Sequence, residues 1–307
     1  MSLTELTKEK QDVLPWVMES DRAYLAWRAQ KLDNFSRALN LAPVFIEDLS
    51  NPTESEQAEL IERCAKTNLA RYETSQKPTD EYSVRADLRG FADTLGLRIA
   101  EKHRSAGEYG VVALKVTDAE RQRGYIPYSR KPMNWHTDGY YNAPEDQIRA
   151  MVLHCFSPAS DGGENQFIDP EIAYIRLRDE NPDHIRALMH PQAMTIPENR
   201  EPDGSVRPAS VGPVFLIDAD GKLAMRYTAR TRSITWRDDP MTKDAVNALV
   251  KILNGNDQLM LTGRLDAGQG ILCNNVLHNR TGFDPDPKNQ SARVIFRVRF
   301  HNRVKGS

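Results

Sequence analysis

Cysteine is scarce in this chain, and its distribution excludes two common kinds of site. The 307 residues contain only Cys64, Cys155 and Cys273, which lie far apart and form no C-x-x-C pair. A disulfide framework and a thiolate zinc site are therefore not expected. A reducing cytoplasm is the expected compartment, and any bound metal must be held by nitrogen and oxygen ligands.

An excess of charge of one sign is also absent. Lys and Arg number 41 and Asp and Glu number 43, so the formal net charge is -2. This balance gives no reason to expect nucleic acid or a membrane as a partner. Mean hydropathy is -0.61, no apolar run approaches membrane-spanning length, and the N-terminus does not resemble a signal peptide. We expect a cytoplasmic protein with a small-molecule substrate, and a homo-oligomer stays open.

Residues 1–105 predict a mostly helical N-terminal region. One helix is predicted between an N-cap at Thr79 and a stop at Gly96, because apolar residues recur at helical spacing within it. Further helices are expected after Asp169, an N-cap followed by proline, and in the segment before Gly255. In the latter we expect inward-facing side chains at Val246, Leu249, Val250 and Leu253.

Residues 106–307 change to the pattern of short strands, at 110–116, 148–156, 165–169, 214–218, 222–228 and 293–303. The last strand alternates, with four apolar residues on one face and Arg293, Arg297 and Arg299 on the other. Segment 196–212 is polar and rich in Pro and Gly, and we interpret it as a long mobile loop that could act as a lid. The predicted fold is mainly β with peripheral helices, a double-stranded β-helix (a cupin-like jelly roll) in a single domain overall.

The stretch NWHTDGYYN places His136 two residues before Asp138. On an extended segment these side chains point the same way and can converge. A third candidate, His278, stands late in the chain in NNVLHNR. Two imidazoles and one carboxylate on one face of a metal leave three positions open, the arrangement of non-haem iron(II) oxygenases. The competing interpretations are a surface His–Asp pair, a hydrogen-bonded core histidine and, for the arginines, a solvated edge strand.

These motifs together resemble the taurine dioxygenase family (TauD/TfdA) of iron(II)/2-oxoglutarate-dependent oxygenases, and within it γ-butyrobetaine hydroxylase. The shared features are HTD followed by aromatics, LHCFSPASDGGENQFID, RYTARTRSITW and NVLHNRTGF, over roughly residues 110 to 303. The N-terminal zinc module of γ-butyrobetaine hydroxylase is absent. The resemblance implies that His136, Asp138 and His278 hold the iron.

The resemblance also assigns the polar residues around the metal. Arg293 would bind the C5 carboxylate of 2-oxoglutarate, and Arg297 would meet an acidic substrate group. Asn165 stands where the family usually has Thr or Ser donating to 2-oxoglutarate. The insert DPDPKNQ lengthens the spacing from His278 to Arg293, so Arg297 or Arg299 stays open as the anchor.

For the substrate, we expect an acidic or zwitterionic small molecule. Trp135, Tyr140 and Tyr141 are candidate substrate contacts, because aromatic rings can form a cage for a cation, although core or rim packing is the commoner role. The expected reaction uses Fe(II), 2-oxoglutarate and O2, with ascorbate as a supporting reductant, and hydroxylates a C–H bond while giving succinate and CO2. The alternatives are a jelly-roll protein that binds metal or a small acid without catalysis, and a zinc hydrolase using the same triad.

Overall fold

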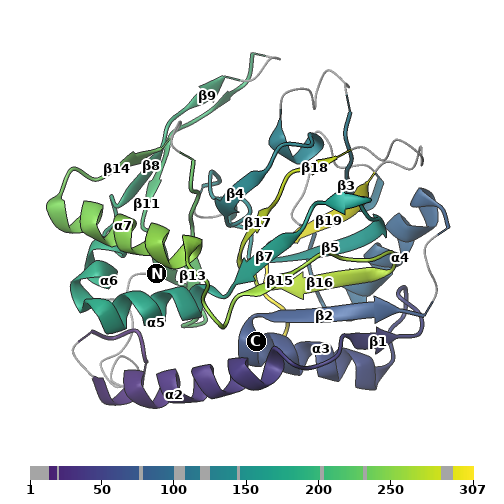
Figure 1. The fold of residues 1–307 in the computed structure, drawn as a ribbon, viewed down its shortest axis with the longest axis horizontal. Coiled ribbons are helices and arrows are strands. Elements are labelled where there is room, and N and C mark those ends of the chain that lie inside the picture. Colours follow the sequence, from purple (N-terminus) through teal and green to yellow (C-terminus); the bar gives the residue numbers. More distant parts are fainter. Residues whose placement is uncertain are drawn as a thin grey trace.

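A six-stranded sheet fills the right-hand part of the molecule as drawn in Figure 1. The computed structural model describes residues 14–18, 21–75, 79–99, 108–117, 125–143, 146–200, 204–230, 234–284 and 293–307. In sheet order the strands are β1 (Val44–Ile46), β2 (Leu69–Thr74), β16 (Gln269–Cys273), β5 (Ala150–Ser157), β19 (Val294–Phe300) and β3 (Val112–Leu114). Neighbours are antiparallel except β1 and β2, which run parallel. The first hundred residues therefore contribute two strands to this sheet as well as helices.

A second sheet has four strands, in the order β15 (Leu261–Gly263), β7 (Asn165–Ile168), β17 (Leu277–Arg280) and β4 (Met133–His136). Its inner face meets the six-stranded sheet through a buried cluster that joins Phe167 of β7 to Leu153 of β5 and Ile295 of β19. Because successive side chains of a strand alternate, the neighbouring residues Ile168 and Leu277 belong to a different cluster on the outer face. The space between the two sheets is where the site described below lies.

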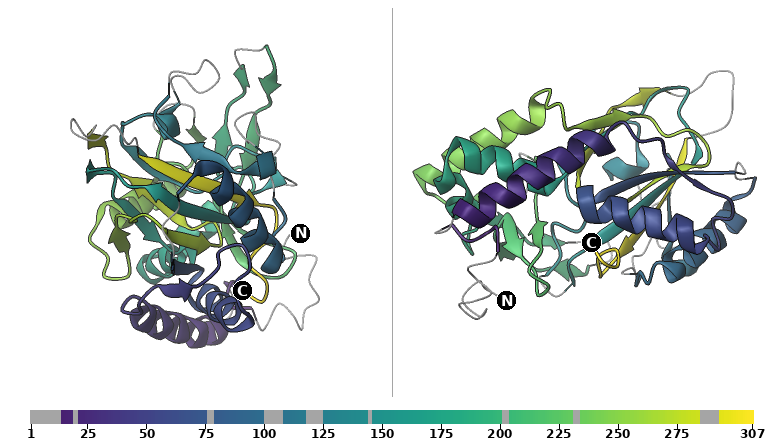
Figure 2. Two further views of the ribbon diagram at one scale, coloured as in Figure 1. Left: turned by 90° about the vertical axis from the view of Figure 1, so that its right-hand side faces the viewer. Right: turned by 90° about the horizontal axis from the view of Figure 1, so that it is seen from below.

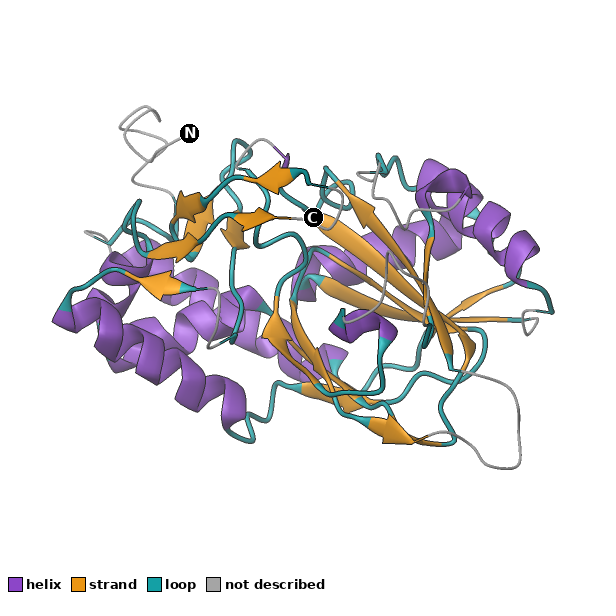
Figure 3. Cartoon of the chain, turned by 90° about the horizontal axis from the view of Figure 1, so that it is seen from above, coloured by secondary structure: helices purple, strands orange, loops and turns teal. Residues whose placement is uncertain are grey.

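Helices cover the outer faces of both sheets. Their bounds are α2 (Asp21–Ala38), α3 (Glu54–Thr67), α4 (Glu81–Thr94), α5 (Pro170–Glu180), α6 (Pro182–Leu188) and α7 (Pro240–Asn254), with single 3-10 turns at Glu108–Gly110 and Ile126–Tyr128. Seen from below, α2 and α3 run along the underside of the molecule (Figure 2). The strands lie between helices gathered at both ends (Figure 3). No helix within the described residues is long and apolar enough to cross a membrane.

The buried apolar side chains explain this arrangement. One cluster packs α3 and α4 against the six-stranded sheet, with Tyr72 and Phe91 among its fully buried residues. A larger cluster packs α2, α5, α6 and α7 against the outer face of the four-stranded sheet and against smaller sheets. At about 25 cal/mol per Å² of apolar area, burial of this kind is the main force that holds the layers together.

The described residues also form four small sheets. They are β8 (Met194–Ile196) with β11 (Ser210–Gly212) and β14 (Thr235–Trp236), β9 (Asn199–Arg200) with β10 (Val206–Arg207), β12 (Phe215–Ile217) with β13 (Leu223–Met225), and β6 (Asp161–Gly162) with β18 (Phe283–Asp284). The prediction of one long loop over 196–212 is wrong in this respect. Its described residues belong to antiparallel strands that form part of a projecting β-ribbon (Figure 1), and β9 and β10 of this ribbon pair through their backbones with exposed or half-buried side chains.

Several local predictions are confirmed. The alternation of the last strand places Val294, Phe296, Val298 and Phe300 together in the cluster under α3 and α4. Asp169 caps α5 by accepting the Glu171 N–H, and α7 ends at Gly255. Two details are wrong: the N-cap of α4 is Asp80 rather than Thr79, and Val250 is 38% exposed instead of facing inward.

Candidate functional site

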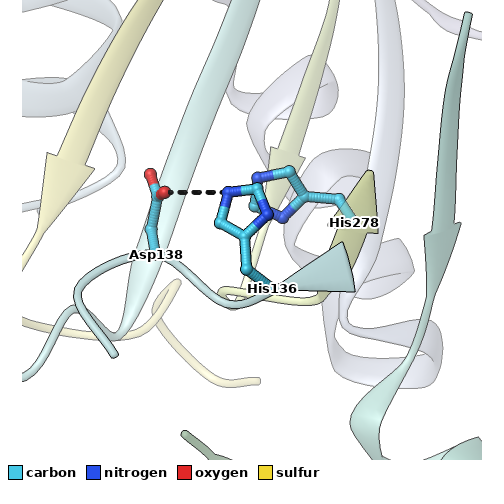
Figure 4. A group of neighbouring side chains, drawn as sticks. All are labelled: His136, Asp138 and His278. Carbon is cyan, nitrogen blue, oxygen red and sulfur yellow. Dashed lines mark ion pairs between the residues drawn. The ribbon is translucent and has the colours of Figure 1, made fainter. Parts of the chain in front are cut away.

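His136 and His278 face each other across adjacent antiparallel strands. They are direct partners in the register of β4 and β17, and their ring centroids are 4.2 Å apart. Strand β4 ends at His136, and Asp138 lies in the turn that follows. The expectation that His136 and Asp138 share one extended segment is therefore wrong. Their side chains nevertheless converge, as Figure 4 shows, because the turn brings the carboxylate back toward the two imidazoles.

The donor atoms of these three residues form a compact group. One ligand atom from each of His136, Asp138 and His278 lies within 4.8 Å of the other two, and all three residues are buried. His136 Nε2 is 3.7 Å from Asp138 Oδ1. In each histidine Nδ1 lies 2.9 Å from the carbonyl oxygen two residues earlier, that of Asn134 or of Val276. An Nδ1–H that donates to a carbonyl fixes the ring and leaves Nε2 with its lone pair available for a metal.

Burial keeps both imidazoles neutral. It lowers the pKa of His136 to about 3, with a smaller contribution from the His278 ring beside it. Burial also lowers the pKa of His278. A neutral imidazole is the form that binds a metal, so the folded chain presents both rings ready to coordinate at ordinary pH.

Two arginines of β19 lie close to this group. Arg297 Nη1 is 3.4 Å from each carboxylate oxygen of Asp138. Arg299 Nη1 donates to the Tyr141 hydroxyl at 3.2 Å. Burial lowers the pKa of Arg299 to about 10 and raises the pKa of Tyr141 to about 12. These two arginines therefore border the Asp138 side of the triad.

Arg293 lies in a different environment, against Phe283 of β18. The guanidinium carbon of Arg293 is 5.2 Å from the ring centroid, and that of Arg280 in β17 is 5.0 Å from the same ring. Burial lowers the pKa of both arginines to about 10, and for Arg293 the positive charge of Arg280 adds to the effect. Within the described residues no carboxylate forms an ion pair with either of them. Buried cations without a carboxylate partner form a ready site for an anion.

The remaining sequence candidates separate into two groups. Asn165 pairs with Arg280 in the register of β7 and β17 and is 6% exposed, so it belongs to the inner face of the sheet. Trp135 precedes His136 and therefore lies on the opposite face of β4, within the large cluster that α5, α6 and α7 form. This placement separates Trp135 from the triad. The alternation rule alone could have revealed it from the sequence.

The pair Tyr140 and Tyr141 packs edge to face at a centroid distance of 5.1 Å. Arginines surround this pair: Arg230 Nη1 donates to the Tyr140 hydroxyl at 3.4 Å, and the Arg207 guanidinium carbon lies 5.7 Å from the Tyr141 ring centroid. These contacts do not resemble a cage of ring faces kept free for a ligand cation, because the Arg207 guanidinium already lies near the Tyr141 ring and the two tyrosine rings pack on each other.

The sequence model of the taurine catabolism dioxygenase family (TauD, TfdA family) matches residues 30–299. The chain belongs to this family. The match begins within α2, so family membership extends into the N-terminal helices, where the sequence offered no recognisable motif.

Two curated relatives are uridine-5'-phosphate dioxygenases. The one from Streptomyces sp. is 28% identical over 185 residues, which are 58% of this chain and 65% of the relative. The one from Amycolatopsis sp. is 25% identical over 169 residues, 53% of this chain and 60% of the relative. The aligned part of this chain thus spans under two thirds of each relative.

Solved structures of oxygenases share the TauD-like fold at low identity. The non-haem iron oxygenase OrfP, solved with Fe and α-ketoglutaric acid, gives a TM-score of 0.58 at 17% identity and covers 96% of this chain and 92% of its own. Asparagine oxygenase, solved with Fe(II), a hydroxyasparagine and succinate, gives 0.56 at 16% identity, with 80% and 78% covered. The particular likeness to γ-butyrobetaine hydroxylase stays a prediction.

Two residues of the site were missed by sequence reasoning, Arg280 and Asn275. Arg280 follows His278 by two residues in a strand, so strand alternation could have placed it on the same face. Asn275 hydrogen-bonds the backbone of Asp138, a residue 137 positions earlier, and no local pattern announces that contact. The insert DPDPKNQ lies almost wholly outside the described residues.

Proposed function

We propose that this protein is an iron(II)/2-oxoglutarate-dependent dioxygenase that hydroxylates a C–H bond of a small anionic substrate. The observation that carries the proposal is the buried cluster of His136, Asp138 and His278 in a chain of the TauD family. We infer that the six- and four-stranded sheets are the two walls of a jelly roll formed by residues 106–307, and that region 1–105 packs on it and adds β1 and β2.

The donor chemistry of the cluster fits ferrous iron. Two neutral imidazoles and one carboxylate form a facial set that leaves three metal positions for other ligands. When bound, the iron would supply the oxidation chemistry with 2-oxoglutarate and O2, giving succinate and CO2. The chain's part is to hold the three ligands: the carbonyl partners of both Nδ1 atoms orient the rings, and the surrounding burial excludes water.

Arg293 is the proposed anchor for the distal carboxylate of 2-oxoglutarate. Arg293 is 8% exposed and has no carboxylate partner among the described residues, whereas Arg297 already contacts Asp138 and Arg299 contacts Tyr141. A planar guanidinium binds a carboxylate through two parallel charge-assisted hydrogen bonds. Arg280, whose guanidinium lies near the same Phe283 ring, adds a second positive charge to this anion site.

For the prime substrate, the positive charge beside Asp138 favours an acidic group. Arg297 contacts the Asp138 carboxylate, and Arg299 donates to the hydroxyl of Tyr141, which follows Asp138 by three residues. The curated relatives act on uridine 5'-phosphate, and a phosphate monoester is one group that such arginines recognise. We propose a substrate with a phosphate or carboxylate group, and uridine 5'-phosphate as the first compound to test.

The test is succinate formation with Fe(II), 2-oxoglutarate, ascorbate and O2 over a panel that includes uridine 5'-phosphate, uridine and zwitterionic amino acids. We expect substrate-stimulated succinate release that disappears without O2, which a zinc hydrolase would not need. His136→Ala should abolish the release, and His190→Ala, a partly exposed histidine away from the triad, should leave it unchanged. Full turnover by His136→Ala would refute the assignment. For a non-catalytic binder, no member of the panel would release succinate.

A further inference from the structure

The side chain of Asn275 forms a clamp on the backbone of Asp138. Its Oδ1 accepts the Asp138 N–H at 2.8 Å, and its Nδ2 donates to the Asp138 carbonyl oxygen at 3.0 Å. The same Nδ2 donates to the carbonyl oxygen of Ile148 at 2.8 Å. Asn275 is 7% exposed, so these three bonds form away from water, where each lost partner is costly.

The clamp acts on the one triad residue that no strand holds. His136 and His278 are fixed by the β4–β17 ladder, but Asp138 lies in the turn after β4. Its carboxylate also lies 3.4 Å from the Arg297 guanidinium, whose positive charge attracts it. A carboxylate on a turn, beside a competing cation, needs a separate restraint to stay aimed at the imidazoles.

The backbone around Asn275 is shaped to deliver that restraint. Asn275 lies between β16 and β17 with a left-handed φ of 50°, a conformation that asparagine tolerates better than most residues. The next residue, Val276, supplies the carbonyl that orients the His278 ring. One short turn therefore fixes two of the three triad residues, Asp138 through a side chain and His278 through a carbonyl.

We propose that Asn275 is a positioning residue that sets the Asp138 carboxylate for metal binding, an inference that rests on the proposed function of the triad. A residue that orients a metal ligand through hydrogen bonds typically changes metal affinity by 10- to 100-fold when it is removed. The effect of Asn275 is on the affinity of the metal, and it is separate from any contact with substrate or co-substrate.

The test measures Co(II) binding to the metal-free full-length chain by calorimetry, together with the thermal unfolding midpoint. In Asn275→Gly the backbone keeps a residue suited to positive φ and only the clamp is lost. We expect Co(II) affinity to fall about 10- to 100-fold. Asn275→Asp keeps the size and an acceptor oxygen but loses the amide donor, and it should also bind Co(II) more weakly.

Asn302→Ala is the matched control. Asn302 makes the same kind of backbone clamp elsewhere, accepting the Arg98 N–H at 2.7 Å and donating to the Gly96 carbonyl at 2.8 Å. Its loss should lower stability while Co(II) affinity stays within about twofold of wild type. Wild-type affinity in Asn275→Gly, or an equal loss in Asn302→Ala, would overturn the inference alone. A wild-type chain that binds no Co(II) would overturn the proposed function as well.

Discussion

Replacing Arg293 with methionine should move stability and co-substrate binding in different directions. Burial lowers the pKa of Arg293 from its ordinary 12.5 to about 10, which corresponds to a cost on the order of 3 kcal/mol for holding the charge in this environment. Methionine retains an unbranched apolar side chain beside Phe283 and removes that cost. The free energy of unfolding without co-substrate should therefore stay within about 1 kcal/mol of wild type or rise.

The same substitution removes the proposed partner of 2-oxoglutarate. Two charge-assisted hydrogen bonds to a carboxylate contribute about 3 kcal/mol, so the Kd for 2-oxoglutarate should rise about 100-fold. The assay is anaerobic calorimetry of 2-oxoglutarate binding to the Co(II)-loaded chain, with urea unfolding of the same variants. Arg37→Met, at a side chain that is 78% exposed on α2, serves as the control and should change neither quantity.

The comparison with the other arginines decides the assignment. Arg297→Met and Arg299→Met should retain most of the 2-oxoglutarate affinity, because their described contacts are with Asp138 and Tyr141. The reasoning is refuted if Arg293→Met binds 2-oxoglutarate as wild type does while one of the other variants loses binding. A loss of more than about 2 kcal/mol of stability in Arg293→Met without co-substrate would also contradict the picture of an unpaired buried cation.

Three further predictions follow from the buried polar groups and the turn at the site. Lys31→Met should lower the free energy of unfolding by about 3–5 kcal/mol in urea titrations, because the buried carboxylates of Asp169 and Glu171 would lose their cation. Each of them has an oxygen 2.6 Å from the Lys31 Nζ. Wild-type stability in this variant would contradict the prediction. Burial lowers the pKa of His154 to about 4, so the unfolded chain takes up a proton at higher pH than the folded chain does. This histidine alone should lower the free energy of unfolding by about 3 kcal/mol as the pH drops from 6.5 to 4, in addition to the loss caused by the lowered pKa values of His136 and His278. His154→Gln should remove that part of the pH dependence, and an unchanged pH slope in this variant would contradict the assignment. Gly139→Ala should weaken the free energy of Co(II) binding by more than it lowers the free energy of unfolding. A Cβ at this position would lie 2.5 Å from Ile148 Cγ1 at a φ of +67°, so it would displace the turn that carries the triad carboxylate. Unchanged Co(II) affinity would mean that the turn adapts.

Local order was readable from the sequence because its causes are local. The alternation in β19 follows from the two-residue period of a strand, and the cap at Asp169 follows from a short acceptor side chain before proline. Thr79 and Asp80 are both favourable N-cap residues. Asp80 is the N-cap of α4 because its side chain accepts from the free backbone N–H groups of Tyr82 and Ser83. The ribbon within 196–212 escaped notice because backbone pairing needs no apolar pattern.

The sequence by itself determined that a metal here must have nitrogen and oxygen ligands, and it singled out His136, Asp138 and His278 as candidates. Only the tertiary structure showed that their donor atoms gather within 4.8 Å, since His278 comes from a segment distant along the chain from His136 and Asp138. It also gave the three arginines of one strand face different neighbours, which identical local patterns cannot do. The clamp from Asn275 to Asp138 was likewise visible only in the tertiary structure, because a hydrogen bond depends on where two segments meet and leaves no periodic pattern in the sequence of either segment.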